Sequence, residues 1–76
     1  MVSACVLVRT SHGRFDEVVQ KIRQIKGVEK VFPVLGRYDV VVDLGDLEPM
    51  ELQSTVLRIG RLAGVVFTET LVEIKI

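Results

Sequence analysis

The chain has 76 residues, 49% of them hydrophobic, and its ten lysines and arginines balance ten aspartates and glutamates. A neutral chain lacks the basic patch that dominates nucleic-acid affinity, which argues against direct DNA binding, and its apolar runs are too short for a membrane-spanning helix. The single cysteine and single histidine exclude an internal disulfide and a His/Cys metal cluster, so we expect no metal or cofactor.

The first half of the chain predicts a strand, a helix and a second strand. Residues 1–10 alternate apolar and polar side chains, which is the period of a strand. Residues 15–25 place apolar side chains at helical spacing, and Gly27 is expected to end this helix as its C′ residue. Residues 28–35 predict the second strand, and Pro33 favours an edge position because proline donates no ladder hydrogen bond.

A hairpin is expected next. Gly36 and Arg37 suit a two-residue loop of the type II′ kind, and residues 38–44 then form the third strand. Since the flanking segments are both strand-like, this loop should bring them together as antiparallel neighbours.

The second helix and the fourth strand complete the chain. Asp46 or Glu48 can cap the helix, which Gly64 is expected to end. Gly60 inside it costs about 1 kcal/mol relative to alanine unless close packing requires it. The apolar stripe of the helix is expected to consist of Leu52, Val56, Ile59 and Ala63. Residues 65–76 alternate again and predict the last strand.

The order strand, helix, strand, strand, helix, strand predicts an α+β fold of the ferredoxin-like βαββαβ type, with antiparallel strand order 4-1-3-2. Residues 1–76 are expected to form one domain, and because no basic leader precedes the first strand, we expect it in the cytoplasm. A chain of this size has a thin core. Its mean hydropathy of +0.41 indicates more apolar side chains than such a core can bury.

Both helices of such a fold cover the same face of the sheet, which leaves the other face to be explained. Its expected apolar members are Cys5, Leu7, Val31, Leu35, Val41, Phe67 and Leu71. They are mixed with Ser3, Arg9, Asp43, Glu69 and Glu73. A contiguous apolar patch marks an interface, so we expect two sheets to pack face to face in a two-fold dimer, a dimeric α/β barrel.

Tyr38 and Asp39 form an ionisable pair between the glycine turn and a run of valines. Strand alternation predicts that they point to opposite faces, with Asp39 on the face expected to form the dimer or beyond its rim. Asp39 can accept hydrogen bonds from neighbouring backbone N–H groups and so fasten the turn. Alternatively, it binds the ammonium of a small ligand while free N–H groups of the Gly36 turn hold the ligand's carboxylate. Chemistry alone favours the structural role.

No catalytic motif is present: the chain has no phosphate-binding glycine loop, no nucleophile elbow and no carboxylate pair in register with His12. Dimeric ferredoxin-like domains nevertheless include small monooxygenases and isomerases, for which a convergent cluster such as His12 with Tyr38 is expected. A third alternative is an assembly module in which Asp39 only fastens the turn.

Two motifs in the expected order resemble the effector domain of the Lrp/AsnC regulators, often called the RAM domain. The first is the hairpin "LGRYDVVVDL", in which Gly36, Tyr38 and Asp39 fit a G-x-Y-D signature. The second is the start of the last strand, "GVVFTETLVEI". Its matching residues are Gly64, Val65, Thr68 and Thr70. The resemblance covers essentially the whole chain.

The resemblance implies an amino-acid-binding subunit, not an enzyme, that dimerises through its sheet and assembles further into rings such as octamers. The implied effector-binding residues are those of the hairpin, Gly36, Arg37, Tyr38 and Asp39, with Thr68 and Thr70 as a second contact region. Family regulators carry an N-terminal helix-turn-helix domain, whereas this chain begins at the first strand, so a stand-alone form is expected. It would then affect transcription indirectly, through mixed assemblies with a full-length Lrp/AsnC paralogue or by competing for effectors.

Overall fold

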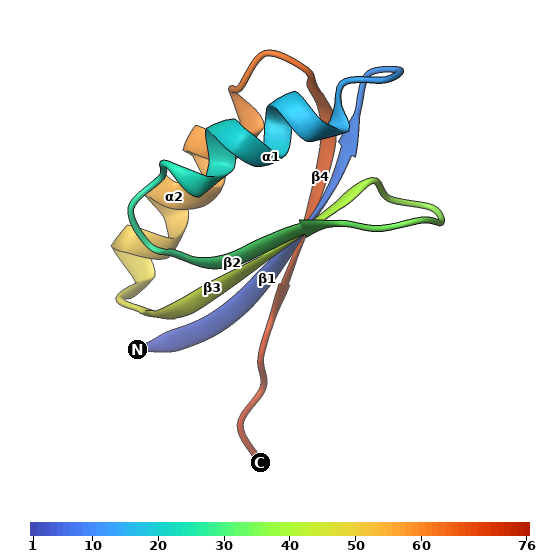
Figure 1. Cartoon of the computed structure of the whole chain (residues 1–76). Helices are drawn as coiled ribbons and strands as arrows, with labels where there is room; N and C mark the ends of the chain where they lie inside the picture. Colours follow the sequence, from blue (N-terminus) through green and yellow to red (C-terminus); the bar gives the residue numbers. More distant parts are fainter.

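A computed structural model describes all 76 residues of the chain, and its elements follow the predicted order (Figure 1). They are β1 (Val2–Thr10), α1 (Phe15–Arg23), β2 (Val28–Pro33), β3 (Val40–Leu47), α2 (Pro49–Gly60) and β4 (Val65–Val72). The sheet has the order β2-β3-β1-β4 with antiparallel neighbours throughout, which confirms the ferredoxin-like fold and the edge position of β2. Neither helix is long and apolar enough to cross a membrane.

The core lies between one face of the sheet and the two helices, which Figure 1 shows on the same side of it. The sheet contributes alternate side chains because the strand period is two, and each helix contributes one stripe. The buried apolar residues are Ala4, Val6, Val8, Val18, Val19, Ile22, Ile25, Val31, Val40, Val42, Leu44 and Ile59. Sequence spacing thus located the core face of every element except β2, the start of α1, where Phe15 is exposed, and the end of α2.

The ends of the helices differ from prediction. The first helix stops at Arg23 with Gln24 as its C-cap, so the prediction of Gly27 as the C′ residue is wrong. Gly27 instead has a φ of +98° in the turn that leads into β2. Helix α2 begins with a capping box, in which the Glu48 N–H donates to the Glu51 side chain at 3.1 Å. It ends at Gly60 with Arg61 as its C-cap, so the prediction that Gly64 ends this helix is also wrong. The helical spacing does not extend to residue 63, which is exposed while its neighbour Leu62 packs on the core.

The sheet face opposite the helices, here the open face, also departs from prediction in two places. Val31 is buried in the core because a register shift in β2 pairs it with Val42, and its neighbour Phe32 takes the place on the open face. Leu35 belongs to the loop after β2 and is fully exposed. The open face therefore consists of Ser3, Cys5, Leu7, Arg9, Lys30, Phe32, Val41, Asp43, Phe67, Glu69 and Leu71.

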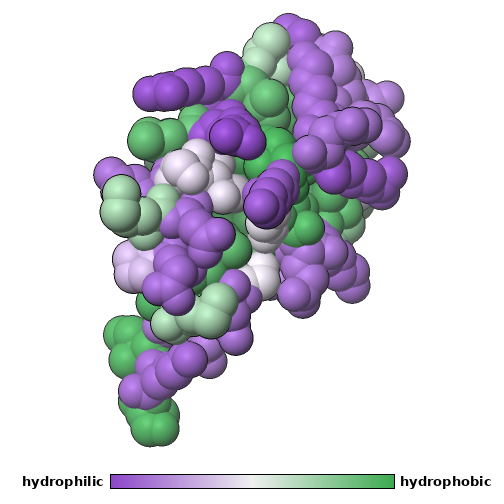
Figure 2. Space-filling view, turned by 90° about the vertical axis from the view of Figure 1, so that its left-hand side faces the viewer, coloured by the Kyte–Doolittle hydropathy of each residue, from purple (hydrophilic) through white to green (hydrophobic).

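Large apolar side chains on this face are not covered within one chain: Phe67 is 52% exposed and Leu71 is 48% exposed. Two apolar residues of the segment after β4, Ile74 and Ile76, are also exposed, and this segment projects from the body of the fold in Figure 1. Figure 2, which views the molecule from another side, shows apolar side chains among polar ones both in the body and at this projecting end. Apolar side chains are thus left uncovered on the open face and in the C-terminal segment, and also beside the loop after β2, where Phe15 and Leu35 are exposed.

Replacement of two glycines by alanine is expected to have opposite effects on stability. Gly64 has a φ of +98°, and an added Cβ would lie 2.9 Å from Val18 Cγ2. Gly60 lies in a helix with nothing within 4 Å of an added Cβ, so close packing does not require it. We expect Gly64→Ala to lower the free energy of unfolding by about 1 to 2 kcal/mol or more, and Gly60→Ala to raise it by about 0.5 to 1 kcal/mol. Urea denaturation at one protein concentration measures both changes in the free energy of unfolding. Equal effects of the two variants would contradict the different roles of Gly64 and Gly60.

Candidate functional site

The connection between β2 and β3 is longer than predicted. The first strand of the pair ends at Pro33 and the second begins at Val40, so the two-residue hairpin over Gly36 and Arg37 is wrong. Residues 34–39 form the loop instead, and Val34 N–H donates to the Asp39 carbonyl at 2.9 Å to close it. The physical reason lies in Asp39, whose N–H donates to Val8 O at 2.9 Å and so bonds to β1 beside the loop.

The Asp39 carboxylate holds the loop to the end of β1. Its Oδ2 atom accepts the Thr10 backbone N–H at 2.8 Å and the Thr10 hydroxyl at 3.3 Å. The structural role considered from the sequence is therefore present, although the donor is not a neighbour in the chain but Thr10 of β1, 29 positions earlier in the sequence. No hydrogen bond involves Oδ1, and the residue is only half-buried. One carboxylate oxygen thus fastens the loop and the other is free for a ligand.

Tyr38 points away from Asp39, as alternation predicted, but the predicted face of Asp39 is wrong. Tyr38 contacts the open face, whereas Asp39 lies near Phe15 of α1. The Tyr38 hydroxyl donates to the Glu69 carboxylate of β4. The Arg9 guanidinium lies 5.7 Å from the centre of the Tyr38 ring and 6.0 Å from that of Phe67, and it donates to Arg37 O at 3.3 Å. These contacts fix the base of the loop to the open face by cation–π attraction and hydrogen bonds.

The tip of the loop presents several unused donors. The backbone N–H groups of residues 35–38 make no hydrogen bond, and the Arg37 guanidinium has neither a hydrogen-bond nor an ion-pair partner. Gly36 has a φ of +140°, which favours glycine at this position. The loop therefore combines a free carboxylate oxygen with free N–H groups and a free cation.

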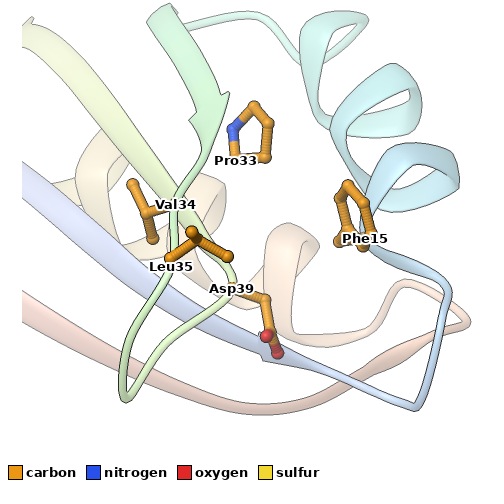
Figure 3. A pocket seen from close by; sticks show the side chains of 5 residues that line it. All are labelled: Phe15, Pro33, Val34, Leu35 and Asp39. Carbon is orange, nitrogen blue, oxygen red and sulfur yellow. The ribbon is translucent and has the colours of Figure 1, made fainter.

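Two hollows adjoin at Asp39. An apolar hollow of about 420 Å³ is lined by Phe15, Pro33, Val34, Leu35 and Asp39 (Figure 3). A polar hollow of about 360 Å³ is lined by Arg9, Thr10, Ser11, His12, Gly13, Arg37 and the two shared residues, Phe15 and Asp39. Sequence analysis missed Phe15 and Thr10 as site residues, because helical spacing assigned the first to the core and no pattern linked the second to Asp39. His12 lines the polar hollow, whereas Tyr38 is directed to Glu69.

Thr68 and Thr70 lie apart from this loop within one chain. Pairing with Val8 and Val6 places them on the helix side of the edge strand β4, where both are half-buried. Asp39 bonds to Val8 from the other side of β1, so two strand spacings, about 10 Å, separate its backbone from that of Thr68. The structure thus brings Gly36, Arg37 and Asp39 together and leaves the threonines as a separate region.

The Tyr38 contact generates a prediction in alkaline solution. The hydrogen bond to the Glu69 carboxylate raises the pKa of Tyr38 above its ordinary value near 10. Because protonated Tyr38 is favoured in the folded state, this contact stabilises the fold below the ordinary pKa and is lost as pH rises through the raised one. Tyr38 is the only tyrosine and there is no tryptophan, so the absorbance near 295 nm directly follows the ionisation of the Tyr38 hydroxyl. Glu69→Gln should lower the titration midpoint, and an unchanged midpoint would contradict the contact.

Comparison with known proteins identifies the family. The family model described as the Lrp/AsnC ligand binding domain matches residues 3–76. The HTH-type transcriptional regulator FL11 of Pyrococcus furiosus is 27% identical over 75 residues, which cover 99% of this chain and 50% of that protein. FL11 of Pyrococcus horikoshii is 29% identical over 72 residues, 95% of this chain and 48% of that protein. The chain therefore spans about half the length of the curated relatives it matches.

Solved structures agree with this result. TTHA0845 from Thermus thermophilus superposes with a TM-score of 0.91 at 32% identity, covering 100% of this chain and 96% of that one. FFRP-DM1 gives a TM-score of 0.89 at 27% identity, covering 97% of this chain and all of the other. Escherichia coli AsnC has the same fold, with a TM-score of 0.88 at 16% identity over 97% of this chain and 51% of its own. The resemblance stated from the two motifs is confirmed, and the chain belongs to the Lrp/AsnC family as a regulatory ligand-binding domain and not an enzyme.

Proposed function

We propose that residues 1–76 act as a domain that binds an amino acid and oligomerises, and that it affects transcription indirectly. The observation that carries the proposal is the free Oδ1 atom of Asp39 on a loop whose N–H groups and Arg37 guanidinium are also unused. A feast or famine regulatory protein from M. tuberculosis, similar in fold at a TM-score of 0.80 and 21% identity, is described as complexed with L-methionine. An α-amino acid suits the loop because it carries one ammonium and one carboxylate.

In the proposed complex each loop residue has a stated task. Asp39 Oδ1 accepts the ligand ammonium in a charge-assisted hydrogen bond while Oδ2 keeps its bonds to Thr10. The N–H groups around Gly36 and the Arg37 guanidinium bind the carboxylate. Tyr38 holds the loop in place through Glu69. Thr68 and Thr70 form a separate contact region on β4. We propose that they contact a ligand bound between two copies of the chain, or the neighbouring copy itself.

The proposed assembly uses the open face. Two copies related by a two-fold axis would bury the exposed side chains of Phe67 and Leu71, with the half-buried ones of Leu7 and Val41, against each other. Dimers would then assemble into rings such as octamers. Since the curated relatives are HTH-type regulators about twice as long, a full-length paralogue is the proposed partner through which this chain reaches DNA.

Binding of an amino acid should stabilise the domain against heat. A thermal-shift screen against the common amino acids at millimolar concentration should show a selective rise in the melting temperature. A ligand at about 100 times its Kd adds about 2.7 kcal/mol to the free energy of unfolding, which is readily measured in a small domain. Asp39→Asn should abolish the shift, because the amide oxygen can still accept the Thr10 N–H while the negative charge is lost.

The control for that variant is Asp46→Asn, which neutralises an exposed carboxylate that accepts the Ser3 hydroxyl at the other end of the sheet. This control should respond like the parent protein. A flat screen with an intact oligomer would favour the assembly module, and loss of the oligomer in Asp39→Asn would assign the residue a structural role alone.

Another prediction concerns the open face. Leu71 on this face and Leu57 on α2 are both 48% exposed, which makes them a matched pair. Leu71→Glu should dissociate the dimer because it would place a carboxylate without a partner in an apolar interface, whereas Leu57→Glu should leave the dimer intact. Sedimentation velocity at micromolar concentration measures both. A monomeric parent protein, or equal behaviour of the two variants, would remove the open-face dimer.

A further inference from the structure

We propose that the effector is an amino acid with an apolar side chain, and that Phe15 at the start of α1 determines this preference. The inference rests on the proposed binding of an amino acid at Asp39 and adds the class of its side chain. It follows from the way in which polar and apolar groups are divided around that residue.

The apolar hollow beside Asp39 has walls from separate parts of the fold. Phe15 forms one wall, and Pro33, Val34 and Leu35 face it from the end of β2 and the loop, with Asp39 at the edge of the space (Figure 3). The volume of about 420 Å³ lies within the range of small-molecule sites. Apart from Asp39, no lining residue has a polar side chain.

The polar and cationic side chains lie on the other side of Asp39. Arg9, His12 and Arg37 all line the polar hollow, and none of them lines the apolar one. An amino acid whose ammonium binds Asp39 can therefore direct its carboxylate toward the polar hollow and its side chain into the apolar hollow. A polar side chain in the apolar hollow would lose its hydrogen bonds to water without a replacement, which disfavours such ligands.

Two large apolar residues that line the hollow are exposed, which supports the proposal that a ligand side chain covers them. Phe15 is 45% exposed and Leu35 is fully exposed, although both are large apolar side chains and neither belongs to the core. The position of Phe15 is fixed by the preceding loop, where Ser11 N–H donates to Gly64 O at 2.8 Å and Arg14 N–H donates to Ser11 O at 3.0 Å. A ligand side chain would thus meet a preformed wall and remove apolar area from water.

Calorimetric titration of the purified protein tests the inference. The probes are leucine, methionine and phenylalanine against asparagine, glutamate and lysine. We expect the best apolar ligand to bind at least about tenfold more tightly than any of the polar ones, because the polar end of asparagine, glutamate or lysine would be buried in the apolar hollow without a hydrogen-bond partner. Lysine is an informative competitor, because its side-chain ammonium offers Asp39 a second cation.

Variants distinguish a specific role of the lining residues in ligand binding from a general effect on the fold. Phe15→Ala should weaken binding of the apolar ligand about tenfold, whereas Phe15→Leu should restore most of it. Leu35→Ala removes the opposite wall at a fully exposed position, where no loss of folding is expected, and should weaken binding in the same direction. Met50→Ala, an exposed apolar residue on α2, should have no effect.

The outcomes distinguish this inference from the proposed function. Heat release with none of the amino acids would overturn both. Tighter binding of a polar amino acid, or binding of an apolar one that Phe15→Ala and Leu35→Ala leave unchanged, would overturn the side-chain class and leave the amino-acid site in place. Apolar preference that both wall variants weaken would support the inference.

Discussion

Both helices cover the same face of a four-stranded sheet, and the rest of the molecule depends on this one-sided cover. The covered face holds the valine-rich core, and the open face retains apolar side chains such as Phe67 and Leu71 that a single chain cannot bury. An open sheet of this size has a thin core, so covering the second face adds apolar burial that the helices do not supply. The hydrophobic content of the sequence and the proposed dimer therefore have the same physical origin.

The loop between β2 and β3 joins the two sides of this arrangement. Asp39 holds it to the central strand through Thr10, while Tyr38 reaches Glu69 on the open face. Arg9 lies between these contacts, against the Tyr38 ring and bonded to Arg37 O. One short segment thus lies beside the proposed effector hollow and also contacts the proposed assembly face. Its position is set by hydrogen bonds at its base, which leaves the tip free to meet a ligand.

Local patterns in the sequence were sufficient for the order of the elements, the sheet topology and most of the core. Alternation failed where a register shift in β2 buries Val31 and turns Phe32 to the open face, since such a shift leaves no trace in a short apolar segment. The hairpin failed for a different reason. The loop length is set by the contact of Asp39 with Val8 and Thr10 on β1, and contacts between residues about thirty positions apart are not encoded in turn propensity.

The candidate site was only partly predictable for the same reason. The motif indicated Gly36, Arg37, Tyr38 and Asp39, and the structure places them in one loop. It could not indicate Phe15 or Thr10, whose spacing is typical of an ordinary helix start and strand end, because only the fold brings them to Asp39. The division of the site into an apolar and a polar hollow is therefore a property of the tertiary structure.

The most direct test of the account is a backbone-amide NMR titration of the ¹⁵N-labelled chain with an apolar amino acid. The account predicts saturable shifts of the Thr10 amide, which is bonded to Asp39, together with the amides of residues 35–38 in the loop. Amides at the far end of the sheet, such as that of Asp46, should not move. Saturable shifts confined to α2 or to the far end of the sheet, or no shifts at millimolar ligand, would contradict a binding site at this loop.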